Sequence, residues 1–170
     1  TELFPNDHES FFNLGNLYRD AKNYQKSKEY YLLSLKINPF HYESNLELAK
    51  IFFSEKNFDQ SLNFVKQCNK INTNSIETHE LKGQILFFTG KFNESLKEFK
   101  FIIEKCPIDQ KEKYIPNVAS NLIELDHIQE AKTLLNQCNL DVGKYNLSLI
   151  YLKEGNYSYG WRNFDFGLKS

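Results

Sequence analysis

The sequence repeats with a period of 34 residues, and this period restricts the chain to a narrow set of architectures. Equivalent residues stand one period apart in three series, which are Gly15, Ala49 and Gly83; Tyr24, Phe58 and Phe92; and Ser27, Ser61 and Ser95. A repeat of this length indicates stacked supersecondary units. Each unit is too small to bury its own apolar face, so the core forms between neighbours.

The period divides the chain into successive units. We predict the end of a preceding repeat at 1–7, three regular repeats at 8–41, 42–75 and 76–109, an irregular fourth repeat at 112–140 and a fifth at 141–170. The fourth repeat resumes only after two extra residues, and the connection to the fifth is five residues short. Pro116 requires a helix that either begins there or bends there, because an interior proline costs about 3 kcal/mol. The segment Ile108–Lys113 is therefore expected to be irregular.

Each unit has the pattern of a helical hairpin. Phe11, Leu14 and Tyr18 lie on one face of a first helix, a turn follows at Lys22-Asn23, and a second helix ends at Asn38-Pro39. The small residues repeat at the positions where two helices of a hairpin must approach closely. The fold class predicted from the period is therefore all-α.

These residues resemble the tetratricopeptide repeat (TPR) family. The motif is Phe11-x-x-Leu14-Gly15-x-x-Tyr18, followed by Tyr24, Ser27, Tyr31 and Pro39 and their equivalents in later units. The resemblance covers almost the whole chain. It implies a right-handed superhelical solenoid of about five helix-turn-helix hairpins.

Composition excludes several functions. A net charge of -1 lacks the basic excess of nucleic-acid-binding proteins. No aliphatic or aromatic run is longer than that at 85–88, which is too short for membrane insertion. Cys68, Cys106 and Cys138 are far apart, so we predict free thiols in a reducing compartment. We therefore expect a cytoplasmic protein.

The chain offers no recognisable set of catalytic, cofactor-binding or metal-ligating residues. Its four histidines, His8, His41, His79 and His127, are far apart along the chain and none belongs to a zinc motif. We therefore predict that this chain performs no chemistry by itself, although it could be the non-catalytic part of an enzyme.

The resemblance implies a binding groove. In TPR proteins the first helix of each hairpin lines a concave face that binds extended peptides or partner helices. The equivalent residues here are Phe12, Asn13, Asn16, Arg19, Leu46, Glu47, Lys50, Phe53, Leu81, Gln84, Phe87, Phe88, Asn117, Ser120, Asn146 and Leu149. The apolar members predict a hydrophobic patch, or alternatively side chains buried between hairpins.

Two devices known from the family can be compared with these positions. Asn13, Asn117 and Asn146 share one repeat position, like the asparagine ladder that binds peptide backbones in O-GlcNAc transferases. Glu47 and Leu81 interrupt this ladder, and the abundance of asparagine in the chain offers another reason for the pattern. The carboxylate clamp of chaperone-binding TPR domains is matched only by Asn16.

Two functions remain open. The first is a protein-interaction scaffold that binds a peptide or a partner protein of unknown identity. The second is the substrate-recognition arm of a larger enzyme such as a glycosyltransferase, because residues 155–164 resemble the last repeat of bacterial TPR proteins that continue into such a domain. Trp161 would then dock on the adjoining domain. Leu3-Phe4-Pro5 and the final residues predict a longer native chain, or self-association through uncapped ends.

Overall fold

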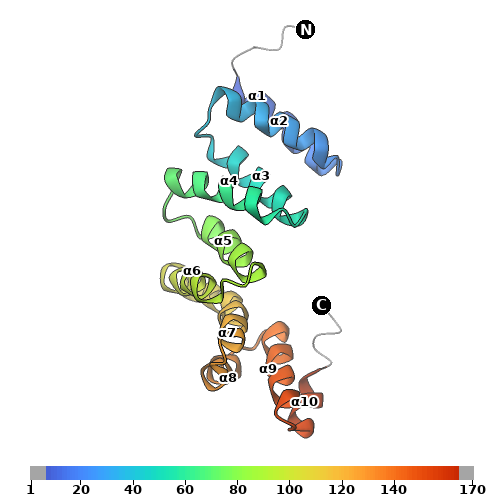
Figure 1. Ribbon diagram of the computed structural model, residues 1–170, viewed down its shortest axis with the longest axis vertical. Coiled ribbons are helices and arrows are strands. Elements are labelled where there is room, and N and C mark those ends of the chain that lie inside the picture. Colours follow the sequence, from blue (N-terminus) through green and yellow to red (C-terminus); the bar gives the residue numbers. More distant parts are fainter. Residues whose placement is uncertain (1–6, 165–170) are drawn as a thin grey trace. The chain divides into compact units, whose positions relative to one another are not determined.

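A computed structural model describes residues 7–164, and the regular structure in that range is helical (Figure 1). The elements are α1 (His8–Asp20), α2 (Tyr24–Ile37), α3 (Tyr42–Ser54), α4 (Phe58–Ile71), α5 (Ile76–Phe88), α6 (Phe92–Lys105), the 3₁₀ helix η1 (Ile108–Tyr114), α7 (Ile115–Glu124), α8 (Ile128–Asn136), α9 (Asp141–Lys153) and α10 (Tyr157–Phe164). The predicted all-α class with helices in consecutive pairs is confirmed.

The chain forms two compact units, residues 1–85 and 86–170. The first unit has two hydrophobic clusters, one around Val65 and Ile85 and one around Tyr31 and Leu48. The second unit buries a separate set of side chains from α6 to α9. This set is Phe99, Ile102, Val118, Ala119, Leu122, Ala131, Leu135, Leu147 and Ile150. Each unit therefore has its own core.

The regular spacing of small residues has a direct steric cause. A Cβ atom added to Gly15 would lie 2.5 Å from two ring carbons of Tyr31, whose side chain is fully buried. A Cβ atom at Gly160 would lie equally close to Leu152. The two helices of a hairpin therefore approach so closely that only a small residue fits at the contact.

The turn between the helices of a hairpin is the same in each pair. One turn residue has a positive φ angle, namely Lys22, Lys56, Gly90, Asp126 and Gly155. The next residue donates its N–H to the helix carbonyl five positions earlier, as in the 2.8 Å bond from Asn57 N to Phe52 O. In the first, second and fifth turns that residue is an asparagine, whose Oδ1 also caps the following helix.

Both glycine and other residues occupy the positive-φ position of this turn. Replacing a lysine there by glycine and a glycine there by lysine should therefore change the free energy of unfolding in opposite directions. A residue with a side chain loses about 1–2 kcal/mol of stability when its φ angle is positive. Glycine avoids this cost but loses more conformational entropy on folding, which offsets part of the difference. We expect Lys56→Gly, where φ is 59°, to raise the free energy of unfolding by up to about 1 kcal/mol. Gly90→Lys, at φ 73°, should lower it by about the same amount. Urea unfolding followed by circular dichroism measures both, and a loss of stability in both variants contradicts the prediction.

The fourth hairpin departs from the regular pattern where the sequence predicted. The 3₁₀ helix η1 covers the expected irregular segment, and α7 begins at Ile115, so that Pro116 lies in the first turn, where its missing N–H has no cost. The carboxylate of Glu112 in η1 accepts a hydrogen bond from Asn139 N in the short connection between α8 and α9.

Two predicted segments lie outside the described residues. They are the end of a preceding repeat, with Leu3, Phe4 and Pro5, and the last six residues of the fifth repeat. The exact repeat boundaries stay a prediction.

Candidate partner-binding site

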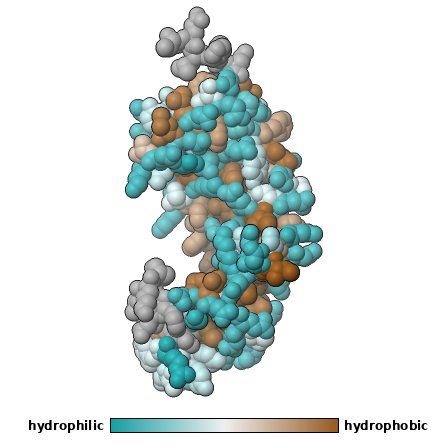
Figure 2. Space-filling view, turned by 180° about the vertical axis from the view of Figure 1, so that it is seen from behind, coloured by the Kyte–Doolittle hydropathy of each residue, from teal (hydrophilic) through white to brown (hydrophobic). Residues whose placement is uncertain are grey.

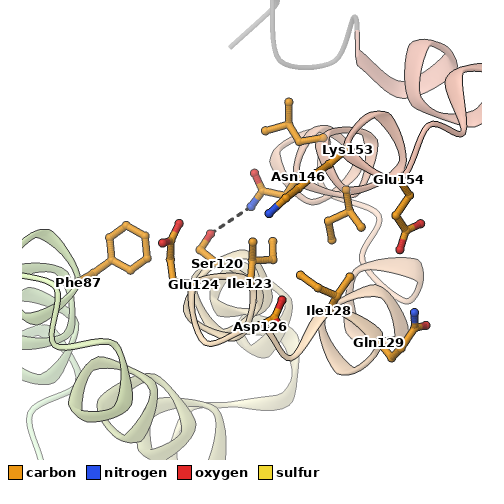
Figure 3. Close-up of a pocket in the computed structure, with 12 residues that line it drawn as sticks. Phe87, Ser120, Ile123, Glu124, Asp126, Ile128, Gln129, Asn146, Lys153 and Glu154 are labelled. Atoms are coloured by element: carbon orange, nitrogen blue, oxygen red, sulfur yellow. Dashed lines mark hydrogen bonds between the residues drawn. The ribbon is translucent and has the colours of Figure 1, made fainter.

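The second unit contains a pocket of about 480 Å³ formed by α5, α7, α8 and α9 (Figure 3). Four residues of the predicted groove line it, namely Phe87, Ser120, Asn146 and Leu149. They come from the first helices of three successive hairpins. The repeat pattern predicts that these helices line one face, and this is why it could group residues that are far apart in the sequence.

A hydrogen bond joins two polar residues of the pocket. Asn146 Nδ2 donates to Ser120 Oγ at 3.3 Å (Figure 3). Ser120 Oγ in turn donates to Pro116 O at 2.9 Å. Ser120 thus orients the amide of Asn146. An amide held in this way can pair with the backbone of an extended peptide, because it carries both a donor and an acceptor.

The rest of the lining is apolar in the middle and charged at the edge. Ile123 and Ile150 contribute aliphatic surface, whereas Glu124, Asp126 and Lys153 contribute charge. Glu154 also lines the pocket, and its carboxylate accepts a 2.8 Å hydrogen bond from Lys132 Nζ. Acidic groups therefore outnumber basic groups around the opening.

Several residues that line the pocket were not predicted from the sequence. Ile123 and Glu124 lie one helical turn after Ser120, and Lys153 lies one turn after Leu149. Extending each predicted position by three or four residues would have found them. The residues that α8 contributes, Ile128 and Gln129, had no such signal, because the family resemblance points only to first helices.

The first unit has a smaller pocket of about 270 Å³. Its lining is Lys50, Phe53, Glu77, Glu80, Leu81 and Gln84, four of which were predicted groove residues. Leu81 is only 7% exposed and belongs to the core cluster, so it forms the floor of this pocket.

A chain of charged side chains joins α1, α3 and α5, which are the first helices of three successive hairpins. Arg19 Nη1 donates to Glu47 Oε2 at 2.7 Å, and Lys50 Nζ donates to Glu47 Oε1 at 2.8 Å and to Glu77 Oε1 at 2.7 Å. Burial by itself raises the pKa of Glu47, but the hydrogen bonds from Lys50 and Arg19 outweigh it and hold the pKa below its usual value. These charges therefore compensate one another within the protein, and Glu47 has a structural role.

Several predicted groove residues have other surroundings. The prediction for Leu46 is corrected, because its side chain is only 4% exposed and packs in the core beside Ala49 and Val65. Phe12 packs against the rings of Tyr31 and His41. Asn16 Oδ1 accepts a 2.7 Å hydrogen bond from Tyr31 Oη.

The remaining predicted residues are more accessible. Asn13 is exposed, Asn117 is half-buried and Phe88 is 62% exposed. Trp161 is 59% exposed, and its ring packs edge-on against that of Phe164 with 5.2 Å between the ring centroids. A docking role for Trp161 stays a prediction. Figure 2 shows hydrophobic residues reaching the surface in separate patches among hydrophilic ones on the face that it draws.

Comparisons with known proteins agree with this fold. Residues 8–41 match the family model for the tetratricopeptide repeat. PilF of Pseudomonas aeruginosa has a TM-score of 0.78 at 14% identity, with 95% of this chain and 75% of that chain covered. YrrB, described as a TPR protein with an unusual peptide-binding site, has a TM-score of 0.78 at 11% identity, with 99% and 88% covered. Yeast Tom70 has a TM-score of 0.67 at 17% identity, with 96% and 36% covered.

No curated protein sequence is a significant match. Because the sequence identity to the solved structures is only 11–17%, the structural similarity shows the fold alone. Residues 8–41 thus match one tetratricopeptide repeat, and the helix pairs of the described chain have the same fold as these structural neighbours. The match of residues 8–41 and the structural neighbours together support the TPR family resemblance.

None of the helices in the described part of the chain is both long enough and apolar enough to cross a lipid bilayer.

Proposed function

We propose that the chain is a protein-interaction scaffold that binds a segment of a partner in the pocket of its second unit. The observation that carries this proposal is the meeting of Phe87, Ser120, Asn146 and Leu149 in one 480 Å³ pocket. The volume lies within the range of about 300–1,000 Å³ that is typical of ligand pockets. YrrB, a protein of the same fold, is described as having a peptide-binding site, which supports this class of partner.

The lining indicates the chemistry of the partner segment. Ile123, Leu149 and Ile150 suit one large apolar side chain, and the Asn146 amide suits the adjoining backbone. Glu124 and Asp126 would attract a basic residue beside that anchor. We therefore expect an extended segment with an aliphatic or aromatic residue next to Lys or Arg.

The same pocket would serve the recognition arm of a larger enzyme. The exposed Trp161 on α10 is the observation that favours this second role, because an exposed tryptophan beside Phe164 is suited to docking on another domain.

We expect Leu149→Asp to weaken binding more than tenfold. Leu149 is 41% exposed, so the substitution leaves the fold intact while it places a carboxylate in the apolar part of the pocket. A library of random peptides displayed on phage and panned on the wild-type chain supplies the probes. The selected peptides should carry the apolar and basic pair, and their affinity for Leu149→Asp, measured by fluorescence anisotropy, should fall more than tenfold.

Val142→Asp is the matched control, because Val142 lies on the same helix, is 48% exposed and does not line the pocket. This variant should bind the selected peptides as well as wild type does. Equal binding to Leu149→Asp and wild type would place the peptide elsewhere and contradict the proposal.

A further inference from the structure

Three side chains with metal-ligating atoms meet at the start of the first unit. His8 and Glu9 are the first two residues of α1, and His41 immediately precedes α3. One ligand atom from each lies within 4.8 Å of the other two. The sequence alone indicated no metal ligands because His8 and His41 are far apart along the chain, but the fold brings them together.

The distances fit a zinc ion. Zinc bonds of about 2.0–2.1 Å in a tetrahedral site place neighbouring ligand atoms about 3.3 Å apart. Glu9 Oε1 lies 3.4 Å from His8 Nε2 and 3.3 Å from His41 Nε2. Two of the three ligand spacings therefore already match. The third, between His8 and His41, is no more than 4.8 Å, and metal binding requires a rotation of His8, whose side chain is 29% exposed, to shorten it.

The surroundings of His41 hold it in the orientation of a ligand. Its Nδ1 lies 2.8 Å from Ser44 Oγ, and Ser44 Oγ donates its own proton to Ser34 Oγ at 3.0 Å. In the tautomer that donates from Nδ1–H to Ser44 Oγ, the Nε2 lone pair is directed at Glu9. In the other tautomer, Nδ1 caps α3 by accepting the N–H of Ser44 at 3.4 Å, which is the longer of the two hydrogen bonds. A ring N–H donated to a neighbour is the usual arrangement of a metal-bound histidine.

A fourth ligand is close at hand. Glu43 Oε2 lies 3.2 Å from His41 Nε2, on a side chain two residues further along the chain. Two neutral imidazoles and two carboxylates would balance the charge of a divalent cation. Imidazole favours zinc over calcium or magnesium, which prefer all-oxygen sites.

We propose that His8, Glu9 and His41 form a Zn²⁺ site, with Glu43 in the fourth position. The ion links the start of α1 to the loop between α2 and α3. It therefore cross-links the first hairpin of this unit to the second.

A titration of the tag-free chain with Zn²⁺ against a chromophoric chelator tests the site. We expect one ion per chain, and at least a tenfold loss of affinity in His8→Ala and in Glu9→Gln. Both residues are accessible, so these variants keep the fold even if His41→Ala, which removes a buried residue, does not. His127→Ala is the control and should bind as wild type does, because His127 lies on another unit beside a different carboxylate, Glu130.

Two further measurements distinguish this site from zinc binding by the cysteines. The absorption spectrum of the Co²⁺-substituted chain should show tetrahedral nitrogen and oxygen ligation, without the sulfur charge-transfer band that the three cysteines would produce. Zn²⁺ should raise the unfolding midpoint of wild type and leave that of His8→Ala unchanged. Absence of stoichiometric binding, equal affinity in His8→Ala and wild type, or a sulfur-ligated spectrum would each overturn the proposal.

Discussion

Gly15→Leu is expected to unfold the first hairpin locally. The new side chain would occupy the space of the Tyr31 ring, which lies 2.5 Å from the Cβ position and has no solvent-exposed surface into which it could move. Overpacking of this kind costs about 3 kcal/mol or more. Since repeats are stabilised mainly by their nearest neighbours, the amides of α1 and α2 should exchange hydrogen about 100-fold faster, as measured by mass spectrometry.

Two variants establish that the Tyr31 ring is the cause. Asn13→Leu adds the same side chain at an exposed position of α1 and should change the stability by less than about 0.5 kcal/mol. The double variant with Gly15→Leu and Tyr31→Ala should be more stable than the sum of the two single effects predicts. Strictly additive effects would show that the clash is not with Tyr31.

The second large effect is expected for Glu47→Gln. This change keeps the size of the side chain but removes the charge that Arg19 and Lys50 both contact at distances of 2.7 and 2.8 Å. A hydrogen bond to a charged group contributes about 1.5–3 kcal/mol, and solvent screening of the partly exposed cations places the expected loss near the lower end. Urea unfolding at pH 7 measures it.

The effect of Glu47 depends on pH in a defined direction. Its pKa in the folded chain lies below the usual value of 4.5, so its contribution is fully present above that value and is lost as the pH falls through the lowered one. The stability difference between wild type and Glu47→Gln should therefore shrink between about pH 5 and pH 3.

Glu55→Gln is the matched control, because Glu55 pairs with one cation, Lys28, and is 39% exposed. It should cost less than about 1 kcal/mol. If the Glu47→Gln difference stays constant from pH 7 to pH 3, the charge of Glu47 is not what stabilises the three first helices.

The fold could be predicted from the period because packing constraints repeat with the sequence. Gly15 and Ser27 are small for a steric reason that holds in each hairpin, so their spacing alone located the helix contacts. The turns were predicted as well, but the positive φ of Lys22 and Lys56 was not, because the hydrogen bonds on both sides of the turn impose it on whatever residue stands there.

The candidate sites were only partly predictable. A position in the repeat does not tell whether a side chain faces solvent or the next hairpin, and for this reason Leu46 and Leu149 received the same prediction although one is buried and the other exposed. His8 and His41 are separated by almost one period. That separation places the start of α1 near the residue before α3, and a search for short ligand motifs does not detect such a pair.

The hydrogen bond between Glu112 and Asn139 has a consequence for how this chain can change over evolution. It connects the place where the sequence gains two residues to the place where it loses five. The added length in η1 thus lies against the shortened connection between α8 and α9. Among homologues, an insertion in η1 should therefore be accompanied by a deletion in the connection between α8 and α9, and a change at one place without the other should be rare.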